Sequence, residues 1–255
     1  MKKGDIVARI SYNFDIIFII FDIVDDVAIL QGLYVRLVAD SPIYDLQIVD
    51  NNDIKKIENE YQIYQRNIIN NYKTKIGHIT GKILHLDSDS NYLDKCMSLY
   101  KSLNIYAVGK VMNECDFSFK IIDLIRQYRP NIIILTGHDS FNNKDIKDLN
   151  NYKNSTNFLN AIIKIREYYS LDDICVFAGA CGSNFEALIA GGANFASSID
   201  RTNIEAYDPA IVGILAAITP LNQIIDVKNF CNYSKMHKKS IGGIETYGKM
   251  RLLMR

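Results

Sequence analysis

The sequence predicts an α/β fold in which a parallel sheet carries helices on both faces, preceded by a small β-rich domain. From residue 77 onward, apolar runs of strand length alternate with segments of helical spacing, a pattern typical of parallel sheets covered by helices. Before residue 49, short runs rich in Val, Ile, Phe and Tyr follow one another, separated by Asp, Asn or Gly. We therefore expect a small β-rich domain at 1–48, a helical connector at 49–76 and an α/β domain at 77–255.

The β-rich domain is predicted to be an SH3-like barrel, because short strands at this spacing are typical of a small barrel or a hairpin meander. Its expected strands are 6–10, 16–23, 27–30 and 35–38. Residues 50–75 then place apolar side chains three and four positions apart among Lys, Glu, Asn and Gln, which predicts one amphipathic helix. We expect its apolar stripe to dock on one of the domains; binding of a partner helix is the alternative.

Strands and helices alternate through the α/β domain. The expected strands are 82–86, 105–109, 131–136, 174–178 and 194–197, where apolar residues of strand type dominate. The expected helices are 91–103, 117–128, 157–169 and 185–190; Pro130 ends the second and Gly191 the fourth. Because ligands of such sheets bind beyond the carboxyl ends of the strands, we expect the catalytic groups at 87–89, 109, 137–139, 179–182 and 197–198.

A His and a Cys stand at the ends of two neighbouring apolar strands. His138 follows Gly137, which permits a sharp exit from the strand, and a His can serve as general acid and base. Cys181 precedes a helix expected to begin near Ser183, and peptide dipoles at a helix N-terminus favour the thiolate. The combination predicts Cys181 as nucleophile and His138 as acid and base. The expected oxyanion donors are N–H groups of the small-residue turns, at Gly137, Asp139, Cys181 and Gly182.

The other cysteines are expected to have no catalytic role, because most buried cysteines are inert. Cys175 stands inside an apolar strand and Cys96 in a helix stripe, so both are expected in the core. Cys115 and Cys231 lie in polar segments without a recognisable partner. No C-x-x-C pair occurs, which argues against a zinc ribbon or a thioredoxin motif, and no metal or organic cofactor is expected.

Two segments around the His and the Cys carry a resemblance to a known clan. Residues 132–139 (IIILTGHD) form an apolar run that ends at the His, and residues 176–181 (VFAGAC) form a later run that ends in Ala-Cys. This arrangement resembles the caspase-like (clan CD) cysteine peptidases and implies a caspase-like sheet. The usual order in that clan is His then Gly, whereas here Gly137 precedes His138.

Seven segments spread over nearly the whole chain carry a second resemblance: 4–9, 35–42, 84–87, 136–139, 177–181, 192–198 and 242–246. They are similar to the YabG family of sporulation-specific proteases. The resemblance implies a cysteine endopeptidase that trims spore coat and cortex-associated proteins, made in the cytoplasm of the sporulating cell and associating with the spore coat. It also implies cleavage after Arg and maps the catalytic pair of the family onto His138 and Cys181.

Substrate selection is expected to depend on acidic residues beyond the strands. In the caspase-like fold, the residue after the first strand of the sheet often helps to form the pocket for the side chain before the cut, and Asp87 occupies that place. A buried carboxylate there would select Arg or Lys by a charge-assisted contact. The alternative is that Asp87 and Asp89 cap the helix near Asn91, with Asp89 the better cap.

Further residues are weaker candidates for the same pocket. Ser197 and Ser198 end a strand and either line the pocket or form a turn. Additional acidic candidates are Glu186, Asp200 and Asp208, and basic candidates for self-cleavage are Arg201, Lys238 and Lys239.

Composition excludes several classes of protein. With 48% hydrophobic and 23% charged residues, the chain can form a folded core. Lys+Arg and Asp+Glu are both 29, so the footprint of a generic nucleic-acid binder is missing, which also disfavours a nucleic-acid module built on the β-rich part. No segment approaches the roughly 18 uncharged apolar residues of a membrane span.

Two alternative functions are weighed against the peptidase. A receiver or nucleotide-binding domain is disfavoured, because Thr136-Gly137-His138 stands where a receiver has its phosphoacceptor Asp and no Walker A sequence occurs. A non-catalytic coat or scaffold protein that keeps the fold is disfavoured by the presence of both His138 and Cys181.

Overall fold

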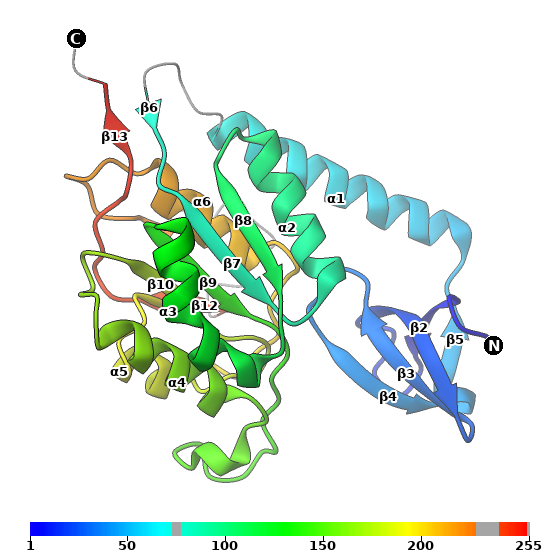
Figure 1. Ribbon diagram of the computed structural model, residues 1–255. Coiled ribbons are helices and arrows are strands. Elements are labelled where there is room, and N and C mark those ends of the chain that lie inside the picture. The colour runs from blue at the N-terminus through cyan, green and yellow to red at the C-terminus, as the bar shows by residue number, and fades with distance from the viewer. Residues whose placement is uncertain (73–77, 228–239, 254–255) are drawn as a thin grey trace. The chain divides into compact units, whose positions relative to one another are not determined.

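The computed structural model describes residues 1–72, 78–227 and 240–253 (Figure 1). The chain divides into two compact units, Met1–Asn67 and Ile68–Arg255. The boundary falls within helix α1 (Asn51–Tyr72), which lies in the region predicted to be helical. None of the helices in the described ranges is both long enough and apolar enough to cross a membrane.

The first unit contains a five-stranded antiparallel sheet in the order β4-β3-β2-β1-β5. Its core consists of six buried apolar side chains: Val7, Phe18, Ile20, Ala28, Leu30 and Leu46. The predicted β-rich character is confirmed, whereas closure into an SH3-like barrel stays a prediction. The elements are β1 (Ile6–Arg9), β2 (Ile17–Val24), β3 (Val27–Gly32), β4 (Val38–Pro42), η1 (Ile43–Asp45) and β5 (Leu46–Ile48).

Two strands of this unit differ from the prediction. The strand expected at 35–38 begins only at Val38, because the chain turns between β3 and β4 and the N–H of Gly32 donates to the carbonyl of Leu37 (2.7 Å). The sequence does not predict β5, since it has three residues and only Leu46 among them is buried. Apolar periodicity is too short there to give a signal.

A six-stranded sheet forms the centre of the second unit, in the order β12-β11-β10-β9-β7-β8. The five strands from β8 to β11 are parallel as predicted, but β12 pairs antiparallel with β11, so the sheet is mixed. The sequence gives no strand signal for β12, because two of its three residues are glycines. The strands are β7 (Ile83–Asp87), β8 (Ala107–Val111), β9 (Ile132–Thr136), β10 (Cys175–Ala178), β11 (Phe195–Ser197) and β12 (Ile241–Gly243), beside a separate pair of β6 (His78–Ile79) and β13 (Arg251–Leu252).

Helices cover both faces of this sheet, as predicted (Figure 1). On one face α3, α4 and α5 bury a core with strand residues such as Leu84, Ile133 and Val176. On the opposite face α2 and α6 pack together, and α6 is apolar all round, so it shows no helical period in the sequence. The helices are α2 (Ser90–Ser102), η2 (Glu114–Asp116), α3 (Phe117–Tyr128), η3 (Leu149–Asn151), α4 (Ser155–Arg166), α5 (Phe185–Ala190) and α6 (Asp208–Ile218).

Candidate active site

The register of the central strands brings four of the five predicted segments to one edge of the sheet: 87–89, 137–139, 179–182 and 197–198. The fifth prediction is wrong, because Gly109 lies inside β8, which runs to Val111. Leu86, Leu135, Ala178 and Ala196 pair side by side across β7, β9, β10 and β11. Neighbouring strands lie about 4.8 Å apart. Three residues beyond this row stand Asp89, His138, Cys181 and Ile199, in the same order. The fold therefore places the predicted His and Cys at corresponding positions of adjacent strand ends.

The main chain of His138 is held on both sides. Its N–H donates to Glu114 Oε1 (2.8 Å), and its carbonyl accepts a hydrogen bond from Asn154 Nδ2 (2.8 Å). Glu114 also accepts a hydrogen bond from Ser88 Oγ (2.6 Å). A Cβ at Gly137 would clash with Glu114 Oε1 and Ser88 Oγ, so a larger residue before the His would require these side chains to move. The sequence does not point to Glu114, because the strand is expected to end at Gly109, whereas β8 ends at Val111, three residues before Glu114.

The ring of His138 contacts Asp89. Nε2 lies 3.1 Å from Asp89 Oδ2, and the exposed fractions of the two side chains are 25% and 9%. Asp89 Oδ1 accepts the N–H groups of Asn91 (2.9 Å) and Tyr92 (3.2 Å) at the start of α2. The capping alternative for Asp89 is therefore confirmed, and its second oxygen faces the candidate general base. The edge of the Tyr92 ring lies against the same imidazole, with centroids 6.2 Å apart.

Cys181 is 4% exposed and lies in a turn after β10. The helix that follows begins at Phe185 with Asn184 as its cap. This confirms the helix predicted at 185–190, whereas the start near Ser183 expected for the Cys turn is wrong. Gly182 has a φ of +70°, which breaks the helical path after the Cys. The dipole effect is confined to the first turn of a helix. The sulfur instead accepts a hydrogen bond from the N–H of Ile204, 3.3 Å from Sγ. An N–H donated to sulfur stabilises a thiolate more than a thiol.

The serines at the end of β11 brace the turn that carries Cys181. Ser197 Oγ donates to the carbonyl of Ala180 (2.9 Å), and Ser198 Oγ accepts the N–H of Gly182 (3.1 Å). Ser198 adopts a left-handed φ of 72° to do so. The N–H of Gly182, an expected oxyanion donor, is thus engaged within the turn. The substrate contacts expected of both serines stay predictions.

Asp139 ties the His turn to the Cys turn. Its Oδ1 accepts the N–H groups of Ser140 (2.8 Å) and Asn154 (2.7 Å), and its Oδ2 accepts the hydroxyls of Ser155 (2.5 Å) and Ser183 (2.8 Å). Burial raises the pKa of this carboxyl, and the four hydrogen bonds oppose the rise. The expected role of its backbone N–H as an oxyanion donor stays a prediction. The side-chain network is a feature that spacing in the sequence does not reveal.

Two buried carboxylates face the side of the sheet covered by α2 and α6. Asp87 is fully buried, accepts the N–H of Asp89 (2.9 Å) and has Oδ2 3.8 Å from His85 Nε2. Asp208 begins α6, is fully buried and accepts the N–H of Glu205 (2.9 Å). The carbonyl of Ala217, near the other end of α6, accepts the N–H of Gly81 just before β7. The helix therefore runs against the strands, and Asp208 lies toward the carboxyl edge, as Asp87 does.

The other acidic candidates are more accessible. Glu186 forms an ion pair with Arg201 (2.6 Å), and its side chain is 64% exposed. Asp200 is exposed. Lys238 and Lys239, two of the predicted self-cleavage sites, lie outside the described residues.

The remaining cysteines fit the structural interpretation where they are described. Cys96 and Cys175 are buried in the core as predicted, and burial raises the pKa of Cys175 to about 12. Cys115 is exposed, and Cys231 lies outside the described residues. Within the described ranges, no group of three His, Cys, Asp or Glu side chains is placed to hold a metal ion.

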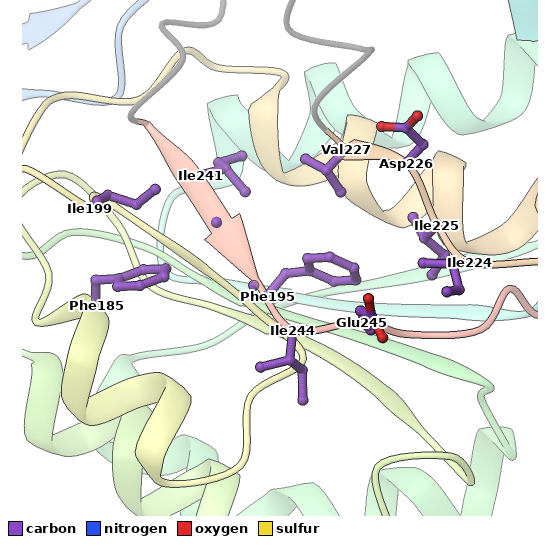
Figure 2. A pocket seen from close by; sticks show the side chains of 12 residues that line it. Phe185, Phe195, Ile199, Ile224, Ile225, Asp226, Val227, Ile241, Ile244 and Glu245 are labelled. Carbon is purple, nitrogen blue, oxygen red and sulfur yellow. The ribbon is translucent and has the colours of Figure 1, made fainter.

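A cavity of about 570 Å³ lies where β11 and β12 form the edge of the sheet. Figure 2 shows apolar side chains around it, among them Phe185, Ile199 and Ile241. Ile199 directly follows Ser198, and Phe185 begins the helix after the Cys turn, so the cavity adjoins the candidate site. The sequence does not predict it, because its lining comes from four separate segments.

Comparisons with known proteins agree across the chain. A family model described as YabG peptidase U57 matches residues 2–255. The chain is similar to the sporulation-specific protease YabG of Bacillus subtilis (strain 168), with 36% identity over 280 residues that cover 98% of this chain and 97% of that protein. No solved structure matches it.

Proposed function

Because the chain belongs to the YabG peptidase family, we propose that it is a cysteine endopeptidase of sporulating cells, with Cys181 as nucleophile and His138 as general acid and base. The observation that carries the proposal is the strand register, which puts both residues three positions beyond paired residues of adjacent parallel strands. The shared Asp139 carboxylate, bonded to Ser183 of the Cys turn, supports a fixed relation between the two turns.

Acylation follows from the chemistry of these two side chains. The thiolate of Cys181 attacks the carbonyl carbon of the substrate, a C–S bond forms and negative charge develops on the carbonyl oxygen. His138, as imidazolium, gives a proton to the leaving nitrogen while the C–N bond breaks. The products of this half-reaction are a free amine, a thioester on Cys181 and a neutral imidazole.

Deacylation uses the same residues in reverse roles. Neutral His138 takes a proton from a water molecule, and the water oxygen attacks the thioester carbon. The C–S bond then breaks, which releases the new carboxyl terminus and restores the thiolate and the imidazolium. Backbone N–H groups near Gly137, Asp139 and Gly182 are the proposed donors to the oxyanion in both steps. Use of the Gly182 N–H requires it to leave Ser198 Oγ.

We propose cleavage after Arg, with Asp87 as the residue that selects the positive charge. Its full burial favours this role, because a carboxylate removed from water binds a guanidinium through strong charge-assisted hydrogen bonds. Asp208 is a second buried carboxylate on the same side of the sheet and toward the same edge. Asp89 is less suited to the pocket, because its Oδ1 caps α2 and its Oδ2 faces His138. Asp87 Oδ2 lies 3.8 Å from His85 Nε2 and must turn from it to bind a guanidinium.

The proposed substrates are spore coat and cortex-associated proteins, and the proposed site of action is the forming spore coat. Self-cleavage at Arg201 is a further proposal. That side chain donates to Tyr152 Oη (2.8 Å), Glu186 Oε2 (2.6 Å) and the carbonyl of Ile199 (3.1 Å), so it must leave all three before it can enter a specificity pocket. Self-cleavage is therefore expected to be slower than cleavage of an extended substrate.

The test compares the reduced parent protein with Cys181→Ala and His138→Ala on fluorogenic peptides that carry Arg, Lys, Asp or Asn before the cut. We expect cleavage after Arg by the parent and none by either variant, with all three equally folded by circular dichroism. Irreversible loss of activity on alkylation of Cys181 is measured in a Cys115→Ser background, because Cys115 is exposed and would also react. Appreciable cleavage by either variant would overturn the dyad. A parent that cleaves neither the peptides nor a spore-coat extract would favour the scaffold alternative.

A further inference from the structure

We infer that Asp89 positions His138, holding the imidazole through Nε2 and leaving Nδ1 as the nitrogen that exchanges a proton during the reaction. The inference rests on the proposed function and adds a third side chain to the catalytic pair. Its basis is the 3.1 Å separation between His138 Nε2 and Asp89 Oδ2. The Asp89 side chain is only 9% exposed, so water competes little for that oxygen.

The two oxygens of Asp89 have separate tasks. Oδ1 is fixed by the N–H groups of Asn91 (2.9 Å) and Tyr92 (3.2 Å) in the first turn of α2. Because the helix backbone holds the carboxylate at one oxygen, the other is presented to the imidazole in a constant direction. An orienting group held by a regular element in this way fixes a catalytic side chain more closely than a mobile one would.

The main chain and the ring of His138 are held by different groups. Glu114 and Asn154 bond to its N–H and carbonyl, so the backbone is fixed without any contribution from Asp89. Asp89 acts on the ring alone, together with the edge of Tyr92. Loss of the Asp89 carboxylate is therefore expected to free or turn the ring while the His turn stays in place.

The chemistry of the carboxylate decides which nitrogen is reactive. An ionised carboxylate only accepts hydrogen bonds, so Nε2 must carry the proton that faces Asp89. A neutral imidazole has one N–H, which leaves Nδ1 as the acceptor for the proton of water. In the imidazolium both nitrogens carry protons, and Nδ1 gives its proton to the leaving amine. Asp89 itself takes no proton at any step.

Two substitutions separate positioning from helix capping. Asn and Ser both cap helices well, so Asp89→Asn and Asp89→Ser keep the start of α2. The Asn amide can donate to Nε2 and hold the wrong tautomer, whereas Ser is too short to reach the ring. We expect kcat to be highest in the parent, lower in Asp89→Ser and lowest in Asp89→Asn. The kcat of Asp89→Asn is expected to fall by about 10³-fold or more, since the same change in a Ser-His-Asp triad costs about 10⁴-fold. KM is expected to stay within about threefold, because the lost contact acts on the transition state.

A merely structural role predicts the opposite order, because Asn resembles Asp more closely than Ser does. Asp148→Asn is the matched control, since Asp148 caps η3 through the N–H of Asn150 and is expected to leave kcat unchanged. Thermal unfolding monitored by circular dichroism verifies that each variant is folded. If one Asp89 variant does not fold, the other still gives the comparison with the parent.

A second readout does not need activity. Nitrogen-15 NMR of labelled histidine reports which ring nitrogen of neutral His138 carries the proton, with His138→Ala to assign the signal. The measurement uses Cys181→Ala as its parent, alone and combined with Asp89→Asn, because no thiolate then retains the imidazolium. We expect protonated Nε2 in the parent and a shift toward protonated Nδ1 in Asp89→Asn. Parent-like kcat in the Asn variant, or a parent with protonated Nδ1, would overturn the inference. If the parent cleaves nothing, the proposed function fails, and the tautomer still decides whether Asp89 positions the ring.

Discussion

Gly137 is favoured by the close approach of two side chains and not by a left-handed backbone, since its φ is not positive. Glu114 Oε1 and Ser88 Oγ occupy the space that a Cβ would need. The same Glu114 oxygen accepts the N–H of His138. The carboxylate that anchors the His138 turn therefore also favours a small residue before the His.

We predict that Gly137→Ala destabilises the protein by about 1–3 kcal/mol, as for other insertions into a packed site, and lowers kcat because the His138 anchor moves. Urea unfolding and peptide cleavage measure the two effects. Ser88→Ala removes one of the two clashing groups, so the double variant should regain part of the stability. Equal stability of Gly137→Ala and the parent would show that the site relaxes without cost.

For substrate selection, Asp87→Asn is predicted to reduce the preference for Arg over a neutral residue by about 10- to 100-fold, the worth of a hydrogen bond to a charged group. The Asn oxygen can still accept the N–H of Asp89, so the turn should stay folded. The measurement is kcat/KM on paired peptides, with Asp208→Asn beside it. An unchanged preference in Asp87→Asn would reject it as the pocket acid, and a loss confined to Asp208→Asn would transfer the role.

For individual side chains, the sequence predicts the proposed nucleophile and the proposed base but not the groups that hold them in place. His138 and Cys181 follow strong apolar strands, and strand ends are recognisable from composition. The contact between Asp89 and His138 depends on the parallel register of β7 and β9, which single-sequence patterns do not determine. Glu114 and Ser183 reach the site from η2 and from the Cys turn, where no periodicity marks them.

The Asp139 carboxylate accepts hydrogen bonds from three segments: the turn after β9, the turn after β10 and the start of α4. Its ordinary pKa is 3.8, and burial raises that value in the folded protein. The folded state thus binds this proton more tightly than the unfolded chain does. The resulting stabilisation is complete below pH 3.8 and is lost as the pH rises through the folded pKa.

Asp139→Asn removes this titration, so the stability advantage of the parent over the variant should be larger near pH 4.5 than at pH 7.5. Urea unfolding at the two pH values measures the difference. Glu186→Gln is a suitable control, because that carboxylate lies at the surface in an ion pair with Arg201. A difference between parent and Asp139→Asn that grows with pH would contradict the raised pKa.

In the second unit, the sequence predicts the elements that have a clear hydrophobic period and misses those that lack one. The sequence predicts α3 and α5 with the bounds that the structure has, because amphipathic spacing and the end signals Pro130 and Gly191 agree. It does not predict α6, whose ten consecutive buried residues hide the helical period. It also misses β12, because antiparallel pairing through glycines depends on distant β11.

For the whole molecule, 29 basic and 29 acidic side chains give zero net charge at pH 7. Repulsion between copies is then weakest, so we predict a solubility minimum near pH 7 and higher solubility at pH 9. Precipitation by polyethylene glycol at a series of pH values measures it. Solubility that does not change between these pH values would show that surface patches, and not net charge, control association.

The Asp139 carboxylate links several backbone amides, so it affects how the site unfolds locally. It holds the backbone amides of Ser140 and Asn154 directly, and those of Ala180 and Asn184 through Ser183 and Ser155. Local opening that breaks one of these links exposes polar groups on the others, which favours release of all of them together. Hydrogen exchange at the four amides should then report one cooperative unit, in which the turns that carry His138 and Cys181 lose their order in a single event.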